Sequence, residues 1–175
     1  DEIKQEMGRL DILVNNAGVT KVVPHQDLDG LQDEDIDRIL TTNFRGSFAC
    51  IRAFQNLLAK SGEGLVINIS SIAGSTAVGS SVAYCASKAA INSMTMSLGR
   101  ALAPNIRVVA VAPGWVAGEY ASRADPAYMQ EQIDKTPLGR IANASDVANT
   151  VVALSTTVTF NTGCIIPVDG GRPLT

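Results

Sequence analysis

Hydrophobic residues follow two different patterns along this chain. Short continuous apolar runs, with the length and the Val, Ile and Leu content of strands buried on both faces, occupy residues 11–15, 65–69, 106–112 and 164–168. Apolar residues at helical spacing occupy the stretches 33–60, 82–103 and 145–154. We expect each of the two longer stretches to be one unbroken helix. The alternation predicts an α/β fold with a doubly wound, Rossmann-like parallel sheet.

The residues between these segments refine the prediction. Pro113-Gly114 opens an irregular segment that runs to about residue 140, within which Asp125-Pro126 begins a short helix. Ser145 and Asp146 are the expected cap of the last helix. No repeat or linker divides the chain, so residues 1–175 are expected to form one domain.

The start of the chain lacks the usual opening of a dinucleotide-binding fold. Such folds begin with a strand, a Gly-rich turn and a helix whose N-terminus holds the pyrophosphate. Here Glu2 to Met7 resemble the tail of a helix that leads into the first strand, and Asn16-Ala17-Gly18 lacks the other glycines. We therefore expect the C-terminal catalytic portion of such a domain, without its first βαβ units, roughly 60 residues or more.

Composition and charge argue against several classes of function. A formal net charge of -3 without a run of Lys or Arg is unlike a protein that binds nucleic acid or an anionic membrane. No apolar stretch approaches the ~20 residues of a membrane helix, and the N-terminus does not resemble a signal peptide. Three widely spaced cysteines fit neither a disulfide framework nor a metal site. We expect a cytoplasmic protein without a metal.

Tyr84 and Lys88 carry the candidate chemistry. They lie one helical turn apart, so both side chains project from the same face. A phenol with an ordinary pKa of about 10 is a poor acid or base at neutral pH unless a nearby cation, here Lys88, stabilises the phenolate. Ser71 lies at the end of a strand, where ligands bind in such sheets. Its hydroxyl would stabilise the oxygen of a carbonyl that receives hydride, while Tyr84 delivers the proton.

The pair alone is more often a core tyrosine beside a solvated lysine. The surrounding sequence changes this balance, because further motifs occur in a familiar order and at familiar spacings. These are Leu10-Asp-Ile-Leu-Val-Asn-Asn-Ala-Gly18, Asn43-Phe-Arg-Gly46, Ile69-Ser-Ser-Ile-Ala-Gly74, Tyr84-Cys-Ala-Ser-Lys88, Pro113-Gly114 and Val168-Asp-Gly-Gly171. Together, across essentially the whole chain, they resemble the short-chain dehydrogenase/reductase family, of the compact single-domain kind.

The resemblance implies a role for each matching residue. The family's catalytic tetrad corresponds to Asn43, Ser71, Tyr84 and Lys88. In the family, the Asn helps to hold a water that links the Lys to a proton relay. The positions that match binding of NAD or NADP are Asn15, Ala17, Gly18, Tyr84, Lys88, Pro113, Gly114 and Val116. By the same resemblance, Lys88 would grip the nicotinamide ribose, the backbone of Val116 would meet the carboxamide, and Asn15 would approach the adenosine side.

The resemblance also implies an activity and an assembly. The activity is NAD(P)-dependent interconversion of an alcohol and a ketone or aldehyde, and the partner is a small-molecule substrate. A homodimer or homotetramer would form through the two long helices. Gly118 departs from the family, which usually has Thr there, and the Gly-rich turn and the residue that selects NAD or NADP have no counterpart. A non-catalytic binding or regulatory relative, or an inactive fragment, therefore remains the alternative.

Other conspicuous residues have simpler interpretations. His25 has no triad partner at a recognisable spacing. Cys85 is expected to be a small buried hydrophobe, and so are Cys50 and Cys164. Trp115 either lines the substrate pocket or packs beneath a lid. The acidic residues at the start of the first long helix favour its dipole, and no metal is implied.

Overall fold

Four parallel strands form a single sheet in the order β1-β2-β3-β4. The computed structural model describes residues 2–174, apart from the side chains of residues 119 and 120. The strands are β1 (Ile12–Asn15), β2 (Gly64–Ile69), β3 (Ile106–Pro113) and β4 (Ile165–Val168). β2 and β3 are buried along almost their whole length, because helices cover the sheet on both faces.

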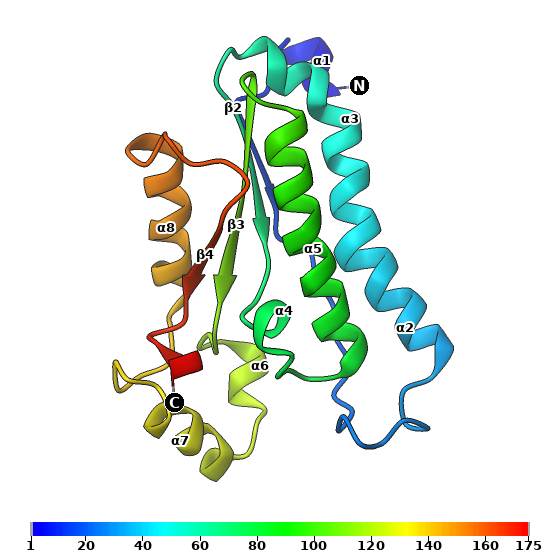
Figure 1. Cartoon of the computed structure of the whole chain (residues 1–175), viewed down its shortest axis with the longest axis vertical. Helices are drawn as coiled ribbons and strands as arrows, with labels where there is room; N and C mark the ends of the chain where they lie inside the picture. The colour runs from blue at the N-terminus through cyan, green and yellow to red at the C-terminus, as the bar shows by residue number, and fades with distance from the viewer. Residues whose placement is uncertain (1, 175) are drawn as a thin grey trace.

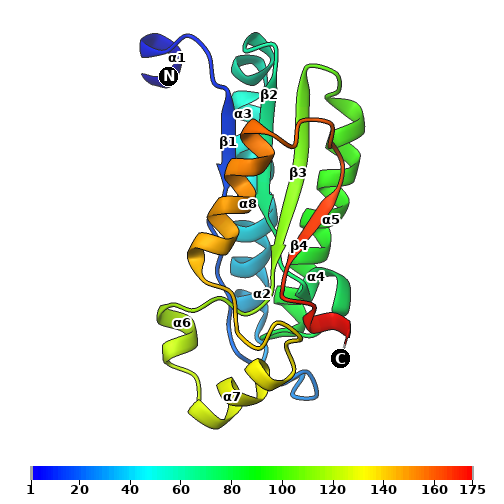
Figure 2. The same cartoon turned by 90° about the vertical axis from the view of Figure 1, so that its left-hand side faces the viewer.

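Helices on the two faces make two separate cores. α2 (Asp33–Leu40), α3 (Ser47–Lys60) and α5 (Val82–Ala101) lie on one face, and α8 (Ala144–Thr156) lies on the other (Figures 1 and 2). The first core consists of Ile51, Leu58, Val66, Met94, Ile106 and Val108. The second consists of Leu65, Ile67, Val109, Val111 and Leu154. Neighbouring strand residues thus face opposite cores, and the prediction of a doubly wound parallel sheet is confirmed.

Shorter helices occupy the connections. α1 (Glu2–Glu6) precedes β1, while α4 (Ala73–Thr76), α6 (Glu119–Ser122), α7 (Pro126–Asp134) and the 3₁₀ helix η2 (Arg172–Leu174) follow the carboxyl ends of strands. Figure 1 shows α4, α6 and α7 at the end of the sheet to which the strand arrows point. The short helix expected at Asp125-Pro126 is confirmed as α7. The Asp125 carboxylate accepts hydrogen bonds from the N–H groups of Ala127, at 2.8 Å, and Tyr128, at 3.1 Å.

The prediction of one unbroken helix over residues 33–60 is wrong at its centre. A π-helical segment, η1 (Thr41–Gly46), separates α2 from α3. Asn43 lies in this wider segment, is fully buried and is hydrogen-bonded to the chain beyond β1. Single π turns inside α-helices are frequent at functional sites. The apolar spacing continues through the segment, so the hydrophobic pattern alone does not signal it.

Two helix ends also differ from the prediction. Asn143 is the residue that precedes α8, and its N–H donates to the Asp146 carboxylate at 2.6 Å. Ser145 and Asp146 therefore lie inside the first turn of α8 and not before it, but Asp146 does help to cap the helix, as predicted, because its carboxylate accepts from the N–H of Asn143. α5 ends at Ala101, two residues before the predicted end of that helix.

Candidate active site

The segments that carry the predicted tetrad meet where β2 and β3 end. Ser71 lies two residues beyond β2, Tyr84 and Lys88 lie near the start of α5, and Asn43 lies in η1. The carboxyl ends of parallel strands share one edge, where ligands bind in open α/β sheets. In Figure 1 the N-terminus of α5 lies beside α4 at this edge. The fold therefore places the tetrad where this class of sheet binds its ligands.

Lys88 is a buried cation beside the ring of Tyr84. Lys88 is only 5% exposed, and its Nζ donates a hydrogen bond of 2.8 Å to the carbonyl of Ile69. The Nζ lies 5.6 Å from the centroid of the Tyr84 ring. Burial lowers the pKa of Lys88 from 10.5 to about 8. At neutral pH the ammonium is still mostly protonated, so it provides positive charge one turn along the helix from the phenol.

Asn43 joins η1 to the chain beyond β1 and to α5. Its Oδ1 accepts a hydrogen bond of 2.8 Å from Val19 N–H, and its Nδ2 donates to the Val19 carbonyl at 3.0 Å. The same Nδ2 donates to Ser87 Oγ at 2.9 Å. Because the side chain is fully buried and hydrogen-bonded at both ends, it fixes three segments relative to one another.

The backbone of Tyr84 is held on both sides by serine hydroxyls. Ser81, which is fully buried, precedes α5 and accepts a hydrogen bond of 3.3 Å from Tyr84 N–H. Ser87 Oγ donates to the Tyr84 carbonyl at 2.7 Å. The first turn of α5 is therefore well anchored at the residue that would move the proton.

Ser71 lies in the turn between β2 and α4. Its Oγ accepts a hydrogen bond of 3.2 Å from Ala73 N–H and lies 3.5 Å from the Pro113 carbonyl, which also accepts from Ile72 N–H at 3.0 Å. The hydroxyl is thus tied to the ends of both β2 and β3. This position suits a group that must meet a substrate oxygen reproducibly.

Gly79 forms the side of the site next to Tyr84. A Cβ built at Gly79 would lie 2.8 Å from Cys85 Sγ, 3.0 Å from Ala73 Cβ and 3.4 Å from Tyr84 Cδ1. The backbone of Gly79 therefore packs directly against the tyrosine ring and against the turn that follows Ser71. A side chain at this position would require Cys85 and Ala73 to shift.

The predicted cofactor residues at the end of β1 and just after it separate into two groups. Gly18 lies beside the tetrad, since a Cβ built on it would be 3.6 Å from Asn43 Oδ1 and 3.7 Å from Lys88 Nζ. Ala17 is exposed next to it. Asn15, by contrast, is buried, and its Nδ2 donates to Asn68 Oδ1 at 2.9 Å. The side chain of Asn15 therefore joins β1 to β2.

The predicted cofactor residues at the end of β3 and just after it contact β4 and the segment that precedes α8. Pro113 ends β3, and Gly114 N–H donates to the Val168 carbonyl at 3.1 Å. Val116 forms a parallel bridge with Ala142. In such a bridge the neighbours of Val116 make the hydrogen bonds, so its own N–H and C=O point away from Ala142. Around Gly118, no described atom lies within 4 Å of a Cβ built there.

A buried polar network behind the tetrad escaped the sequence analysis. Ser70 Oγ donates to Asn92 Oδ1 at 2.6 Å and lies 3.2 Å from the Lys88 carbonyl, and Asn68 Nδ2 donates to Thr95 Oγ1 at 3.0 Å. This network joins the end of β2 to the middle of α5. An amide within an apolar strand requires a buried partner, so Asn68 in the run 65–69 was the available signal.

The structure agrees with the sequence-based expectations for some of the other conspicuous residues and differs for others. Cys85 is buried, and burial raises the pKa of its thiol, which fits a small hydrophobe. Cys50 is exposed, so the expectation that it is buried is wrong, while Cys164 is half-buried. Trp115 packs edge-to-face against Tyr128 of α7, with ring centroids 5.7 Å apart. The Nε2 atom of His25 lies 3.1 Å from the Gly79 carbonyl oxygen.

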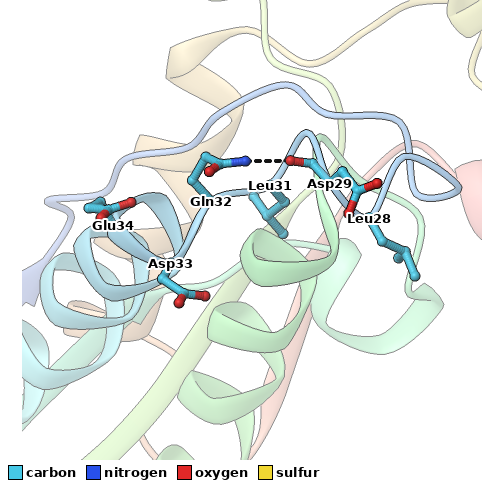
Figure 3. Close-up of a pocket in the computed structure, with 6 residues that line it drawn as sticks. All are labelled: Leu28, Asp29, Leu31, Gln32, Asp33 and Glu34. Carbon is cyan, nitrogen blue, oxygen red and sulfur yellow. Dashed lines mark hydrogen bonds between the residues drawn. The ribbon is translucent and has the colours of Figure 1, made fainter.

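A hollow of about 300 Å³ lies away from the tetrad, at the start of α2 (Figure 3). Its lining residues are Leu28, Asp29, Leu31, Gln32, Asp33 and Glu34. The carboxylates in this lining lie near the N-terminus of α2, where they interact favourably with the positive end of the helix dipole. In the described part of the chain, no group of three or more His, Cys, Asp or Glu residues is arranged to hold a metal ion. Within residues 2–174, no helix is both long and apolar enough to cross a membrane.

Comparisons with known sequences agree with this arrangement. A family model described as enoyl-(acyl carrier protein) reductase matches residues 1–172. A Streptomyces violaceoruber protein assigned as ketoacyl reductase 2 of the granaticin polyketide synthase is 40% identical, over 99% of this chain and 70% of that protein. The 3alpha-hydroxysteroid dehydrogenase of Mediterraneibacter gnavus is 35% identical, over 97% of this chain and 68% of that protein.

Solved structures agree as well. A Burkholderia xenovorans protein assigned as a short-chain dehydrogenase/reductase has a TM-score of 0.91 and 35% identity, and the match covers 100% of this chain and 70% of that one. The gluconate 5-dehydrogenase of Burkholderia cenocepacia, in complex with NADP and tartrate, has a TM-score of 0.91 and 28% identity, over 100% of this chain and 69% of that one. The chain belongs to the short-chain dehydrogenase/reductase family of oxidoreductases.

Proposed function

We propose that this chain carries the catalytic residues of an NAD(P)-dependent oxidoreductase that interconverts an alcohol and a ketone or aldehyde. The buried ammonium of Lys88 beside the ring of Tyr84 is the observation that carries the proposal. Burying a charge costs folding free energy, so a buried lysine is rarely a structural choice. One turn from a phenol, its charge makes the phenol a usable acid and the phenolate a usable base.

The residues beside Lys88 fit a nicotinamide cofactor. Gly18 carries no side chain, and a Cβ built on it would lie only 3.6 Å from Asn43 Oδ1 and 3.7 Å from Lys88 Nζ, so a ribose that approaches over Gly18 would meet both groups. An ammonium has three donors, of which one binds the Ile69 carbonyl. The N–H and C=O of Val116, directed away from Ala142, match the acceptor and donor of a carboxamide. When bound, the cofactor would supply or accept the hydride.

The chain's own groups would handle the proton and the developing charge. In the reducing direction, the hydroxyls of Tyr84 and Ser71 would both bind the substrate oxygen. Tyr84 would donate its proton as negative charge develops there, and the Ser71 hydroxyl would stabilise that charge. Lys88 would stabilise the phenolate that remains. In the oxidising direction the phenolate would accept the proton of the alcohol, since one transition state serves both directions.

The test uses the protein as its gene encodes it, with NADH and NADPH and three carbonyl substrates. These are a 3-oxoacyl thioester, a 3-oxosteroid and 5-ketogluconate, chosen from the names of relatives. Oxidation of the nicotinamide, followed by its absorbance, reports turnover. We expect at least one substrate to be reduced, and Tyr84→Phe to lower kcat by about 10² to 10⁴-fold with unchanged cofactor affinity.

Tyr128→Phe is the matched control, because Tyr128 lies on α7 and is 44% exposed. This variant should keep the activity of the unaltered protein. Full activity in Tyr84→Phe would exclude Tyr84 as the general acid. A protein whose melting temperature rises with neither cofactor, and which turns over none of the substrates, would favour the alternative of a non-catalytic relative.

A further inference from the structure

Residues 20–25 lie alongside the segment that precedes α5. Val23 N–H donates to the Ser80 carbonyl at 2.8 Å, and the hydroxyls of Thr20 and Ser80 are hydrogen-bonded. The third contact is between His25 Nε2 and the Gly79 carbonyl, at 3.1 Å. We call residues 20–25 the bridging segment, because it connects the chain beyond β1 to the wall formed by Gly79.

The other side of the bridging segment is anchored to α2. Lys21 Nζ forms an ion pair with the Asp35 carboxylate and donates to the Gly30 carbonyl at 3.3 Å. The Arg38 guanidinium lies 3.5 Å from the Thr20 carbonyl oxygen. The segment thus has a fixed support on α2 from which its far end can hold Gly79.

The backbone around Gly79 needs contacts of this kind to hold it in place. Ala77, just before Gly79, has a φ of +56°, in the left-handed region that non-glycine residues rarely adopt. Strained residues of this kind persist where the surrounding structure holds them. Gly79 packs on the ring edge of Tyr84 and on Ala73, two residues beyond Ser71. A displaced Gly79 would therefore alter the packing both of the Tyr84 ring and of the turn that follows Ser71.

We propose that His25 is a positioning residue that holds Gly79 against Tyr84 and so sets the fit of the carbonyl substrate. A carbonyl oxygen only accepts hydrogen bonds, so His25 acts through a hydrogen on Nε2. The contact reaches the Tyr84 ring through Gly79, whereas Gly18 and Val116 lie where the cofactor is proposed to bind. This inference rests on the proposed function for its kinetic part and on geometry alone for its structural part.

Two replacements separate the hydrogen bond from the volume of the ring. His25→Gln keeps a side-chain N–H donor of similar reach, and His25→Leu fills similar space without a donor. Gln26→Leu, at the exposed neighbouring position, is the control. Amide hydrogen exchange of residues 77–81 is measured first, because it requires no substrate. Steady-state kinetics then follow with the carbonyl substrate that turns over and with the nicotinamide cofactor.

Loss of one hydrogen bond predicts that His25→Leu speeds exchange of residues 77–81 and lowers kcat/KM for the carbonyl substrate, each about 3- to 10-fold. The KM for the cofactor should stay unchanged, and His25→Gln and Gln26→Leu should resemble the unaltered protein. Equal impairment in His25→Gln and His25→Leu, or no change of exchange in His25→Leu, would overturn the proposal. If the unaltered protein turns over no substrate, the proposed function fails, and the exchange experiment still decides the role of His25.

Discussion

Replacement of Lys88 by Met should abolish catalysis and stabilise the fold. Met has a similar length and no charge, and Lys88 is almost completely buried. The burial that lowers the pKa of Lys88 from 10.5 to about 8 is a cost of keeping the ammonium in the folded protein. Removing the charge removes this cost, and it also removes the cation that the Tyr84 phenolate would need.

The size of the effect follows from the change in pKa. At about 1.4 kcal/mol for each tenfold change in proton affinity, the difference between 10.5 and about 8 corresponds to about 3 kcal/mol. Leaving the Ile69 carbonyl without its hydrogen bond offsets about 1 to 2 kcal/mol of this. We therefore expect the free energy of unfolding of Lys88→Met to exceed that of the unaltered protein by about 1 to 2 kcal/mol at neutral pH.

The difference should depend on pH with a definite sign. Between about pH 8 and pH 10.5, Lys88 has lost its proton in the folded protein but keeps it in the unfolded chain. The unfolded state then binds more protons, so the stability of the unaltered protein rises with pH across this window. Lys88→Met lacks this rise. The advantage of the variant should therefore shrink and then reverse as the pH approaches 10.5.

Urea unfolding, followed by circular dichroism at a series of pH values, measures this difference. Lys60→Met is the control, because Lys60 is exposed at the end of α3 and its replacement should change stability by no more than about 0.5 kcal/mol. A Lys88→Met protein that is less stable than the unaltered protein at neutral pH would contradict this prediction. A difference between the two proteins that stays constant across the alkaline window would contradict it as well.

Three further predictions follow from the geometry. Ser71→Ala should lower kcat by about 10² to 10³-fold without changing cofactor affinity, since it removes one donor to the substrate oxygen; unchanged turnover would contradict this role. Gly99→Ala should lower the free energy of unfolding by about 1 to 3 kcal/mol, because the new Cβ would lie 2.4 Å from Gly163 N. The control is Gly118→Ala, whose Cβ would meet no described atom within 4 Å, and it should leave the stability measured by the same urea titration unchanged. The Arg140 guanidinium lowers the pKa of Asp146 from 3.8 to about 2. The stability from this pair is therefore present above pH 3.8 and lost as the pH falls through about 2, so an acid titration should show that Asp146→Asn loses less stability over this range than the unaltered protein.

The sheet, the helix over Val82–Ala101 and the pairing of Tyr84 with Lys88 could be predicted because their signals are local, whereas Asn43 was assigned by resemblance to the family. Val66 and Leu65 face opposite cores because residues alternate along a strand. Tyr84 and Lys88 share a helix face because of their spacing in the sequence. Neither inference needs knowledge of which distant segments come together.

The buried hydrogen bonds around the site could not be predicted, because they depend on contacts between residues far apart in the chain. Asn43 meets Val19 and Ser87, and His25 meets Gly79, with no pattern in the sequence to connect them. Cys50 immediately precedes the buried Ile51, and one residue along a helix turns the side chain by about 100°. That rotation is enough to expose Cys50, although its segment is amphipathic.

The π turn in η1 has a consequence for the helix that follows it. A π turn contains one more residue than an α turn, so α3 is rotated by about 100° relative to a continuous α-helix from α2. Ile51 and Leu58 face the sheet with this rotation, while Asn43 faces Val19. Deleting a single residue within η1 would restore regular helix geometry and bring these two requirements into conflict. Either the Asn43 amide would then lose its contact with Val19, or Ile51 and Leu58 would turn away from the sheet. One inserted residue therefore determines which face of α3 packs against the sheet.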